Sequence, residues 1–165
     1  MKKARRFHFA FKTEYGGITR ELRTEIKIKL PSSMVGRTNT GWIGLVGLWD
    51  TGATHSVITK SVVDRLKLIP TGKTMVFGIN TSELRDTFMV DIGLPNRVAI
   101  PDVTVTECVI NSPGIDVIIG MNIIQLGDFS ISNGPGKTFF SFAIPPFPNP
   151  VDLLAKSIAV NPKKR

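Results

Sequence analysis

The 165-residue chain has little cysteine and little histidine: Cys108 is its single cysteine, and His8 and His55 are its two histidines. One cysteine cannot form a disulfide within the chain or build a cysteine-based zinc site, and the two histidines match no metal-ligand spacing. The sequence therefore predicts neither a disulfide framework nor a metal centre. Sparse cysteine is typical of a reducing compartment, so a cytoplasmic location is expected.

The sequence also lacks a long apolar run. No stretch of about 18 consecutive apolar residues occurs, which excludes a transmembrane helix. The basic N-terminus is followed by Phe7–Lys12, which is too short and too polar to be the core of a signal peptide. We therefore expect no membrane partner.

Net charge is scarce in the body of the chain. The formal charge is +8, but residues 1–6 contribute four positive charges and residues 163–165 contribute three, which leaves +1 for residues 7–162. A folded nucleic-acid-binding face needs basic residues clustered on the body, so no specific nucleic-acid partner is expected. The basic ends are interpreted as solvated tails.

Alternation of apolar and polar residues dominates the remaining sequence. Phe7–Phe11, Ile26–Leu30 and Val98–Val109 alternate with a period of two, which is typical of strands with one buried face. Turn-forming residues, such as those at 133–136, separate these segments. The pattern predicts an all-β protein whose short strands form a closed or sandwiched sheet.

Helical signals are sparse. Residues 60–68 place apolar side chains on one helical face after Thr59, which is a plausible N-cap. A second short helix is predicted to begin at Ile123 and to end at Gly127.

The segment Leu48-Trp49-Asp50-Thr51-Gly52 places a carboxylate directly after an apolar strand. A carboxylate at the end of a buried strand is costly unless donors satisfy it, and the small residues after Asp50 leave room for backbone N–H groups or a ligand. An ordinary turn at a strand end explains the same residues. This segment alone leaves both interpretations open.

A second apolar strand, Val117-Ile118-Ile119-Gly120, is followed by Asn122 and the short predicted helix. In this order and at this spacing, the two motifs resemble those of the retropepsin-like aspartic proteases, and the similarity extends over residues 44–131. The resemblance implies an all-β, retropepsin-like closed barrel of mostly antiparallel strands, with one or two short helices and one lobe per chain. It also implies that water is the nucleophile, so no cofactor is expected.

The resemblance assigns Asp50 as the catalytic aspartate, and it implies that Thr51, Gly52, Ser56, Gly120 and Asn122 support the active site. In the family, the residues at Ser56 and Asn122 hydrogen-bond to each other. Residues 74–81 are predicted to form the flap, a hairpin that closes over bound peptide, although a surface hairpin has the same pattern. Substrate contacts are expected from Gly52, Ala53, Thr54, Val57, Val76, Gly78, Ile79 and Ile118. Each apolar residue of this set is equally explained by core packing.

The sequence departs from the retroviral pattern at two linked positions. Retroviral members have an arginine after the glycine of the second motif, and it pairs with an acid after the first motif. This chain has Met121 and Thr54 at those positions. The joint loss is consistent with a free-standing, non-retroviral branch. Trp49 stands where smaller aliphatic residues are usual, and it is predicted to belong to the core.

The C-terminal end has no counterpart in the family pattern. We predict a protease domain over residues 1–146, which includes the N-terminal strands within 7–43. The extension over residues 147–165 is predicted to comprise a proline-rich linker, a short apolar helix that begins at Pro150 with Asn149 as its cap, and a basic tail.

Only one of the eight aspartates, Asp50, is followed by Thr-Gly. Peptide hydrolysis by this chemistry needs two carboxylates, one acting on the attacking water and the other on the carbonyl oxygen. The second carboxylate must then come from a second copy in a two-fold dimer. The predicted function is a homodimeric aspartic endopeptidase acting on extended peptides or proteins. The alternatives are a catalytically silent dimer that binds extended peptides, and an adaptor that binds nucleic acid or membranes through its tails.

Overall fold

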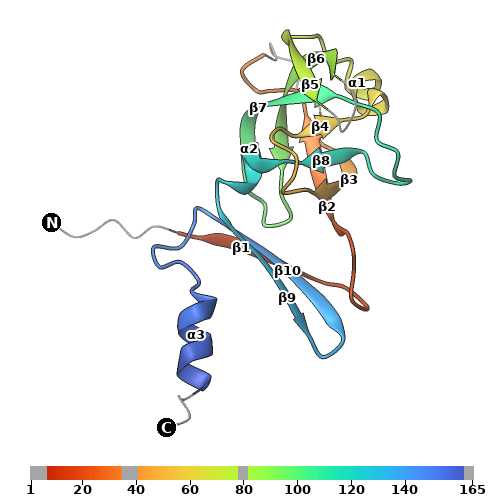
Figure 1. Cartoon of the computed structure of the whole chain (residues 1–165). Coiled ribbons are helices and arrows are strands. Elements are labelled where there is room, and N and C mark those ends of the chain that lie inside the picture. The colour runs from red at the N-terminus through yellow and green to blue at the C-terminus, as the bar shows by residue number, and fades with distance from the viewer. Residues whose placement is uncertain (1–6, 35–40, 78–81, 162–165) are drawn as a thin grey trace, which may run out of the picture.

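The computed structural model describes residues 7–34, 41–77 and 82–161 (Figure 1). Their elements follow the chain as β1 (Phe9–Glu14), β2 (Leu22–Lys29), β3 (Ile43–Trp49), β4 (Val57–Ile58), α1 (Lys60–Leu66), β5 (Gly72–Phe77), β6 (Ser82–Gly93), β7 (Ala99–Glu107), β8 (Val117–Ile119), α2 (Met121–Ile124), β9 (Asp128–Gly134), β10 (Lys137–Ile144) and α3 (Leu153–Val160).

Seven strands form the larger sheet, in the order β2-β3-β8-β4-β7-β6-β5. β2 also pairs with β6, through residues 27–29 and 91–93, so the sheet closes into a ring with β5 outside it. Most neighbours are antiparallel, and the exceptions are the parallel pairs β3–β8 and β4–β7. The all-β, mostly antiparallel prediction is confirmed, and the predicted closed barrel takes the looser form of this ring. The described residues contain three helices: α1 and α2 are the short helices expected in the barrel, and α3 is the one expected in the C-terminal extension.

The core follows from the alternation in the sequence. In β2, Ile26 and Ile28 are buried while the intervening Lys27 is exposed. Successive side chains of a strand point to opposite faces, so one face of each strand supplies the core. The same face of the neighbouring strands adds the fully or almost fully buried side chains of Ile58, Phe88, Val90, Ile92, Val105, Val117 and Ile119.

β1, β10 and β9 form a separate, three-stranded antiparallel sheet (Figure 1). Trp49, at the end of β3, joins this smaller sheet to the larger one. Its ring centroid lies 4.9–6.1 Å from those of Phe11, Phe129, Phe140 and Phe142. The indole N–H donates to Thr24 Oγ1 at 2.9 Å, and Trp49 is 4% exposed. The prediction that Trp49 belongs to the core is confirmed.

The first two helices differ in detail from the sequence prediction. α1 begins after Thr59 as predicted, but it ends at Leu66, and the Thr59 side chain makes no capping hydrogen bond. Its hydroxyl oxygen is instead buried without a partner among the described residues. α2 begins at Met121 rather than Ile123, because the chain turns into the helix as soon as β8 ends at Ile119.

α3 begins at Leu153, so the predicted start at Pro150 and the predicted cap Asn149 are wrong. Asp152 is the cap, because its carboxylate accepts the Ala155 N–H at 2.9 Å. A carboxylate at this position satisfies a free backbone donor and lies at the positive end of the helix dipole. None of the helices within the described residues has the length and apolar character needed to cross a bilayer.

Asp91 is a buried carboxylate at a break in the register between β6 and β7. It accepts the Asp102 N–H at 3.0 Å and the Ser32 hydroxyl at 3.0 Å, and Lys29 Nζ lies 3.4 Å away. Burial raises the pKa of Asp91, but these donors outweigh it and hold the pKa below its ordinary value. The carboxylate therefore ties the end of β2 and the following loop to β7.

Because its folded-state pKa lies below that of the unfolded chain, charged Asp91 stabilises the fold fully above the unfolded value of about 3.9. This contribution is lost as the pH falls through the folded pKa. We expect Asp91→Asn to lower the free energy of unfolding by about 1–3 kcal/mol near neutral pH. Urea titrations at several pH values should show the difference from wild type shrinking below about pH 4. A difference that stays constant down to acid unfolding would contradict this role.

Candidate active site

Asp50 lies directly after the last residue of β3. Its backbone N–H donates to Ile119 O at 3.0 Å, so the parallel ladder between β3 and β8 extends to the aspartate. Its Oδ1 accepts the Gly52 N–H at 2.8 Å, and the residue is only partly buried. The two interpretations of this segment, an ordinary turn and a functional carboxylate, are therefore compatible. The hydrogen bond of the turn holds the Asp50 carboxylate, and the carboxylate remains accessible to solvent.

Gly120 lies where the end of β8 crosses the loop that follows Asp50. A Cβ atom on Gly120 would lie 2.6 Å from the carbonyl carbon of His55 and 2.8 Å from the carbonyl oxygen of Ala53. The next residue, Met121, donates its N–H to Ala53 O at 2.7 Å. The two backbones are therefore in direct contact, and no side chain fits between them.

Ser56 and Asn122 reinforce this crossing. The fully buried Ser56 hydroxyl accepts the Gly120 N–H at 3.0 Å and donates to Asn122 Oδ1 at 2.8 Å. Asn122 Oδ1 also accepts the Ser56 N–H at 2.9 Å, and the Asn122 N–H donates to Thr54 O at 3.1 Å. The structure thus brings both sequence motifs into one hydrogen-bonded unit beside Asp50.

A hollow of about 320 Å³ opens next to Asp50. The end of β3, the loop before β2, and β9 with its neighbour β10 supply its walls. Its lining residues are Thr19, Arg20, Glu21, Leu22, Leu48, Trp49, Asp50, Thr51, Phe129, Ile131, Asn133 and Thr138.

Comparison with known proteins agrees with this geometry. A family model described as aspartyl protease matches residues 44–123, the part of the chain that contains both motifs and their crossing. A crystal structure of a retropepsin-like aspartic protease from Rickettsia conorii is similar over 84% of this chain and 96% of that chain, with a TM-score of 0.50 and 11% identity. The chain has a retropepsin-like fold, and its residues 44–123 match the aspartyl protease family model.

A second solved structure similar to this retropepsin-like chain is EIAV protease complexed with the inhibitor HBY-793. It is 24% identical, with a TM-score of 0.45, over 67% of this chain and 90% of that chain. At 11% identity the Rickettsia conorii structure shows a shared fold and nothing finer. No curated protein matches the chain.

The substrate-contact residues expected of a retropepsin-like protein lie on both sides of the crossing. Val57 and Ile118 are partly buried and directly paired across β4 and β8. Gly52 and Thr54 are exposed, and Ala53 is partly buried. Gly52, Ala53 and Thr54 thus lie in the loop that follows Asp50, and Val57 and Ile118 lie on β4 and β8.

The predicted flap is described in part. β5 and β6 form an antiparallel pair that extends to Phe77 and Ser82, and Val76 lies on it, partly buried. Gly78 and Ile79, which were expected at the tip, lie outside the described residues.

The two motifs did not reveal the outer walls of the hollow beside Asp50. Arg20 and Leu22 precede the first motif, and Phe129 and Ile131 follow the second. Strand alternation marks 129 and 131 as one face of a strand, but only the docking of the smaller sheet through Trp49 places that face beside the aspartate.

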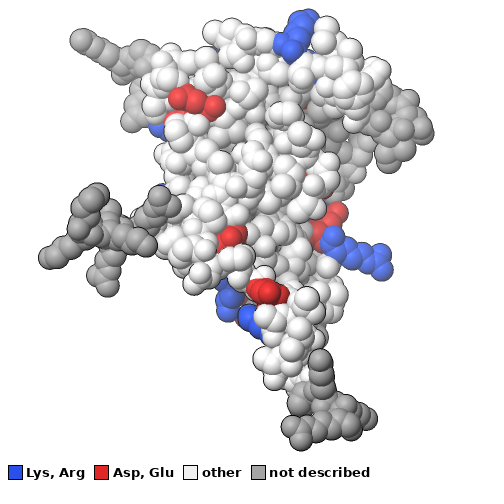
Figure 2. All heavy atoms as spheres, turned by 60° about the vertical axis from the view of Figure 1, so that its left-hand side comes forward, with Lys and Arg blue, Asp and Glu red and all other residues white. Residues whose placement is uncertain are grey.

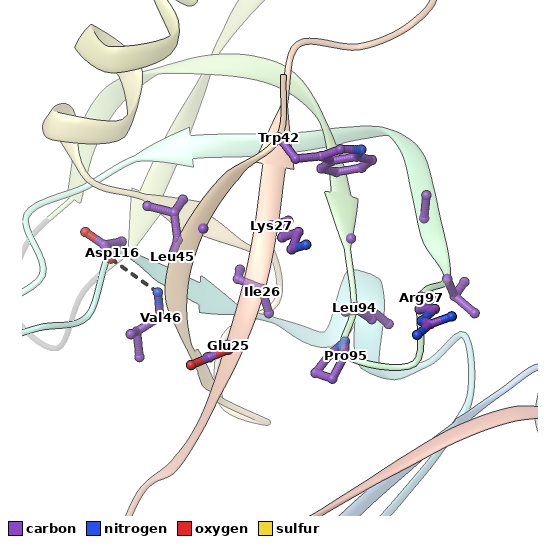
Figure 3. Close-up of a pocket in the computed structure, with 14 residues that line it drawn as sticks. Glu25, Ile26, Lys27, Trp42, Leu45, Val46, Leu94, Pro95, Arg97 and Asp116 are labelled. Atoms are coloured by element: carbon purple, nitrogen blue, oxygen red, sulfur yellow. Dashed lines mark hydrogen bonds between the residues drawn. The ribbon is translucent and has the colours of Figure 1, made fainter. Parts of the chain in front are cut away.

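A larger hollow, of about 820 Å³, lies at the start of β3 (Figure 3). Trp42, Lys27 and Arg97 line it, and at its opposite side Asp116 accepts the Val46 N–H at 3.3 Å. None of the predicted site residues lines this hollow, so its size does not make it the retropepsin-like site. Within the described residues, no three histidine, cysteine or acidic side chains are grouped as metal ligands.

The contact at Gly120 predicts a steric requirement. Its φ of −93° suits any residue, so Gly120→Ala costs stability only because the added methyl group meets backbone atoms that cannot rotate away. We expect the free energy of unfolding to fall by about 3 kcal/mol or more, measured by urea denaturation.

Gly44→Ala is the matched control, because a Cβ there meets nothing within 4 Å. This variant should keep nearly the wild-type stability. Equal effects of the two substitutions would show that the crossing is not sterically tight.

Proposed function

We propose that the chain is a homodimeric aspartic endopeptidase that hydrolyses peptide bonds in extended peptides or proteins. The observation that carries the proposal is Asp50: a partly buried carboxylate, fixed by the Gly52 N–H at the end of β3, beside a hollow. A buried crossing that includes Gly120 and Ser56 holds this carboxylate in place.

In the proposed reaction, Asp50 of one protomer takes a proton from a water molecule, whose oxygen attacks the carbonyl carbon of the peptide bond. Asp50 of the other protomer is protonated and donates its proton to the carbonyl oxygen. The C–N bond of the resulting tetrahedral intermediate then breaks. The first Asp50 passes the proton that it took from water to the leaving amine nitrogen, and the second Asp50 takes back a proton from the hydroxyl group formed on the carbonyl oxygen. Thr51 and Gly52, next to the aspartate, would support this pair.

The edge strand β9 supports the pairing of two chains. Within the described residues β9 pairs with β10 alone, so its other edge is free. β9 has a charged residue only at its first position, Asp128, and it has no proline; charges and prolines are the features that usually protect an edge strand from pairing. Ile131 is 49% exposed and lines the hollow beside Asp50. We propose that a second copy adds at this edge, which lies beside the hollow that Asp50 also lines.

An extended substrate would lie between the aspartates and the β5–β6 hairpin, bonded through its main chain. Val57, Val76 and Ile118 would form walls of its side-chain pockets. We assign residues 1–146 to the protease domain and 147–165 to an extension. We place the protein in the cytoplasm, because a single cysteine suits a reducing compartment.

Asp50→Asn tests the proposal. Asparagine keeps an oxygen that can accept the Gly52 N–H, so the fold and its melting temperature should be unchanged. Cleavage of a peptide library at about pH 5 should fall by at least about 100-fold, because the variant cannot carry out the proton transfers. Full-rate cleavage by the variant would contradict the proposal. Equal peptide binding with no cleavage by either protein would favour the silent dimer.

A mixing experiment tests whether two chains form one site. Wild type and Asp50→Asn are refolded together in equal amounts, which leaves about a quarter of the dimers with both aspartates. Cleavage should then be about a quarter of that given by the same total amount of wild type. A value of about a half would mean that each chain acts alone.

A further inference from the structure

The hollow of about 820 Å³ at the start of β3 has no role in the proposed reaction (Figure 3). Its volume is within the range of ligand pockets, which is about 300–1,000 Å³. Gly44, near the first residue of β3, lines it, whereas Asp50 follows the last residue of the same strand. At about 3.3 Å per residue, extended backbone of this length places the two about 20 Å apart. The hollow is therefore separate from the site at Asp50.

The floor of the hollow is bare backbone on either side of one lysine. Lys27 of β2 pairs with Gly44 of β3 on one side and with Gly93 of β6 on the other. The neighbours of Lys27 in this row therefore have no side chains. A Cβ atom on Gly44 would meet nothing within 4 Å, so the space above it is open. The two glycines thus keep the floor of the hollow open.

Trp42 forms a fixed aromatic wall of the hollow. Its ring lies against Gly93, where a Cβ atom would come within 3.3 Å of the ring carbon Cζ3. The Lys29 ammonium group lies 5.0 Å from the ring centroid, in a cation–π contact, and 3.4 Å from the buried Asp91 carboxylate. Trp42 is nevertheless 41% exposed. An exposed aromatic surface that is already held in place loses little entropy when a ligand packs on it.

Two basic side chains lie on one side of the hollow. Lys27 is exposed on the floor, and Arg97 is exposed on the turn between β6 and β7 (Figure 3). Arg97 has a φ of 64°, which is rare for a residue with a side chain. Its turn is fixed, because Leu94 O accepts the Arg97 N–H at 3.0 Å and the Asn96 amide donates to Phe9 O at 2.9 Å. Within residues 7–34, 41–77 and 82–161, neither basic side chain has an acidic partner.

Two acidic side chains lie on the other side of the hollow. Glu25 is two residues before Lys27 on the same face of β2, and it pairs with Val46 of β3. Asp116 lies at the far edge of β3, where its Oδ2 accepts the Val46 N–H at 3.3 Å. In the part of the chain that the structure describes, Glu25 has no basic partner. The hollow therefore has an acidic side and a basic side (Figure 3).

This separation of charge is a local feature. Figure 2 shows charged side chains of both signs scattered over the face that it displays, with no broad area of one sign. Residues 7–162 together carry a net charge of only +1. Opposite charges on the two sides of one hollow complement a ligand that carries both charges at its two ends.

We propose that this hollow is a second peptide site, which binds a short peptide with free ends and takes no part in catalysis. The peptide carboxylate pairs with Lys27 and Arg97, and its ammonium group pairs with Glu25 and Asp116. An apolar side chain of the peptide packs on Trp42. The binding uses no residue of the proposed active site, so it can be tested separately from the endopeptidase activity.

The arrangement favours a peptide over the other ligands of a basic pocket. Nucleotides and nucleic acids present phosphates, which Glu25 and Asp116 would repel. A single amino acid carries both of its charges on one carbon atom, so it cannot reach both sides of the hollow. Each further residue of an extended peptide separates the two charges by about 3.3 Å.

Titration calorimetry of the full chain with the tripeptide alanyl-alanyl-phenylalanine tests the proposal. Wild type should bind it at least about tenfold more tightly than its C-terminal amide, its N-acetyl derivative or free phenylalanine. Lys27→Gln combined with Arg97→Gln should weaken the binding at least about tenfold and should no longer distinguish the tripeptide from its amide. Gly44→Leu should abolish the binding, because the leucine side chain occupies the hollow.

Arg65→Gln combined with Lys67→Gln is the matched control, because it removes one arginine and one lysine that are exposed at the end of α1. This control should bind the tripeptide as wild type does, and every variant should keep the wild-type melting temperature. Unchanged binding by Gly44→Leu, or equal loss in the control and the Lys27–Arg97 variant, would overturn the proposal. So would phenylalanine binding as tightly as the tripeptide, or no binding of the tripeptide by wild type at about 1 mM.

Discussion

The contact between the end of β8 and the loop after β3 is the constraint on which the site depends. Gly120 touches the backbone of residues 53–55, and the Ser56 hydroxyl links it to Asn122. The buried polar groups at this crossing are hydrogen-bonded to one another. If the loop moved, these groups would lose their hydrogen-bond partners, which is costly for a buried group. Asp50 is three residues from this contact and is bonded to β8 through its own N–H. The crossing therefore fixes the position of the carboxylate.

Trp49 provides the second constraint, one residue before Asp50. Its ring is the point at which the β1-β10-β9 sheet docks on the ring of strands, and Phe129 of β9 is among its contacts. Trp49 thus has two roles. It fills the core next to Asp50, and its contact with Phe129 holds β9 beside the hollow that Asp50 lines. Fold stability and the proposed assembly of a two-chain site therefore depend on the same aromatic cluster.

The sequence predicted those parts of the structure that depend on local pattern. Alternation gave the strands and the buried face of β2, and the two motifs gave the retropepsin-like fold and the hydrogen bond between Ser56 and Asn122. The walls contributed by Arg20 and Ile131 could not be predicted, because long-range docking of the smaller sheet places them. The predicted cap of α3 was wrong because Asn149 and Asp152 are both good capping residues. Only the structure distinguishes them, by the hydrogen bond from the Ala155 N–H to the Asp152 carboxylate. Apolar periodicity marked α3 as a helix but could not show that nothing within the described residues covers it.

The account as a whole claims that one carboxylate per chain meets its symmetry mate. The most direct test is an experimental structure of the assembly that the protein forms in solution, with the separation of the two Asp50 carboxylates measured in it. We expect a two-fold dimer in which their nearest oxygens are about 3 Å apart, close enough to share a proton. A monomer, or an assembly in which each Asp50 is far from the other and closed off from any cleft, would contradict the account.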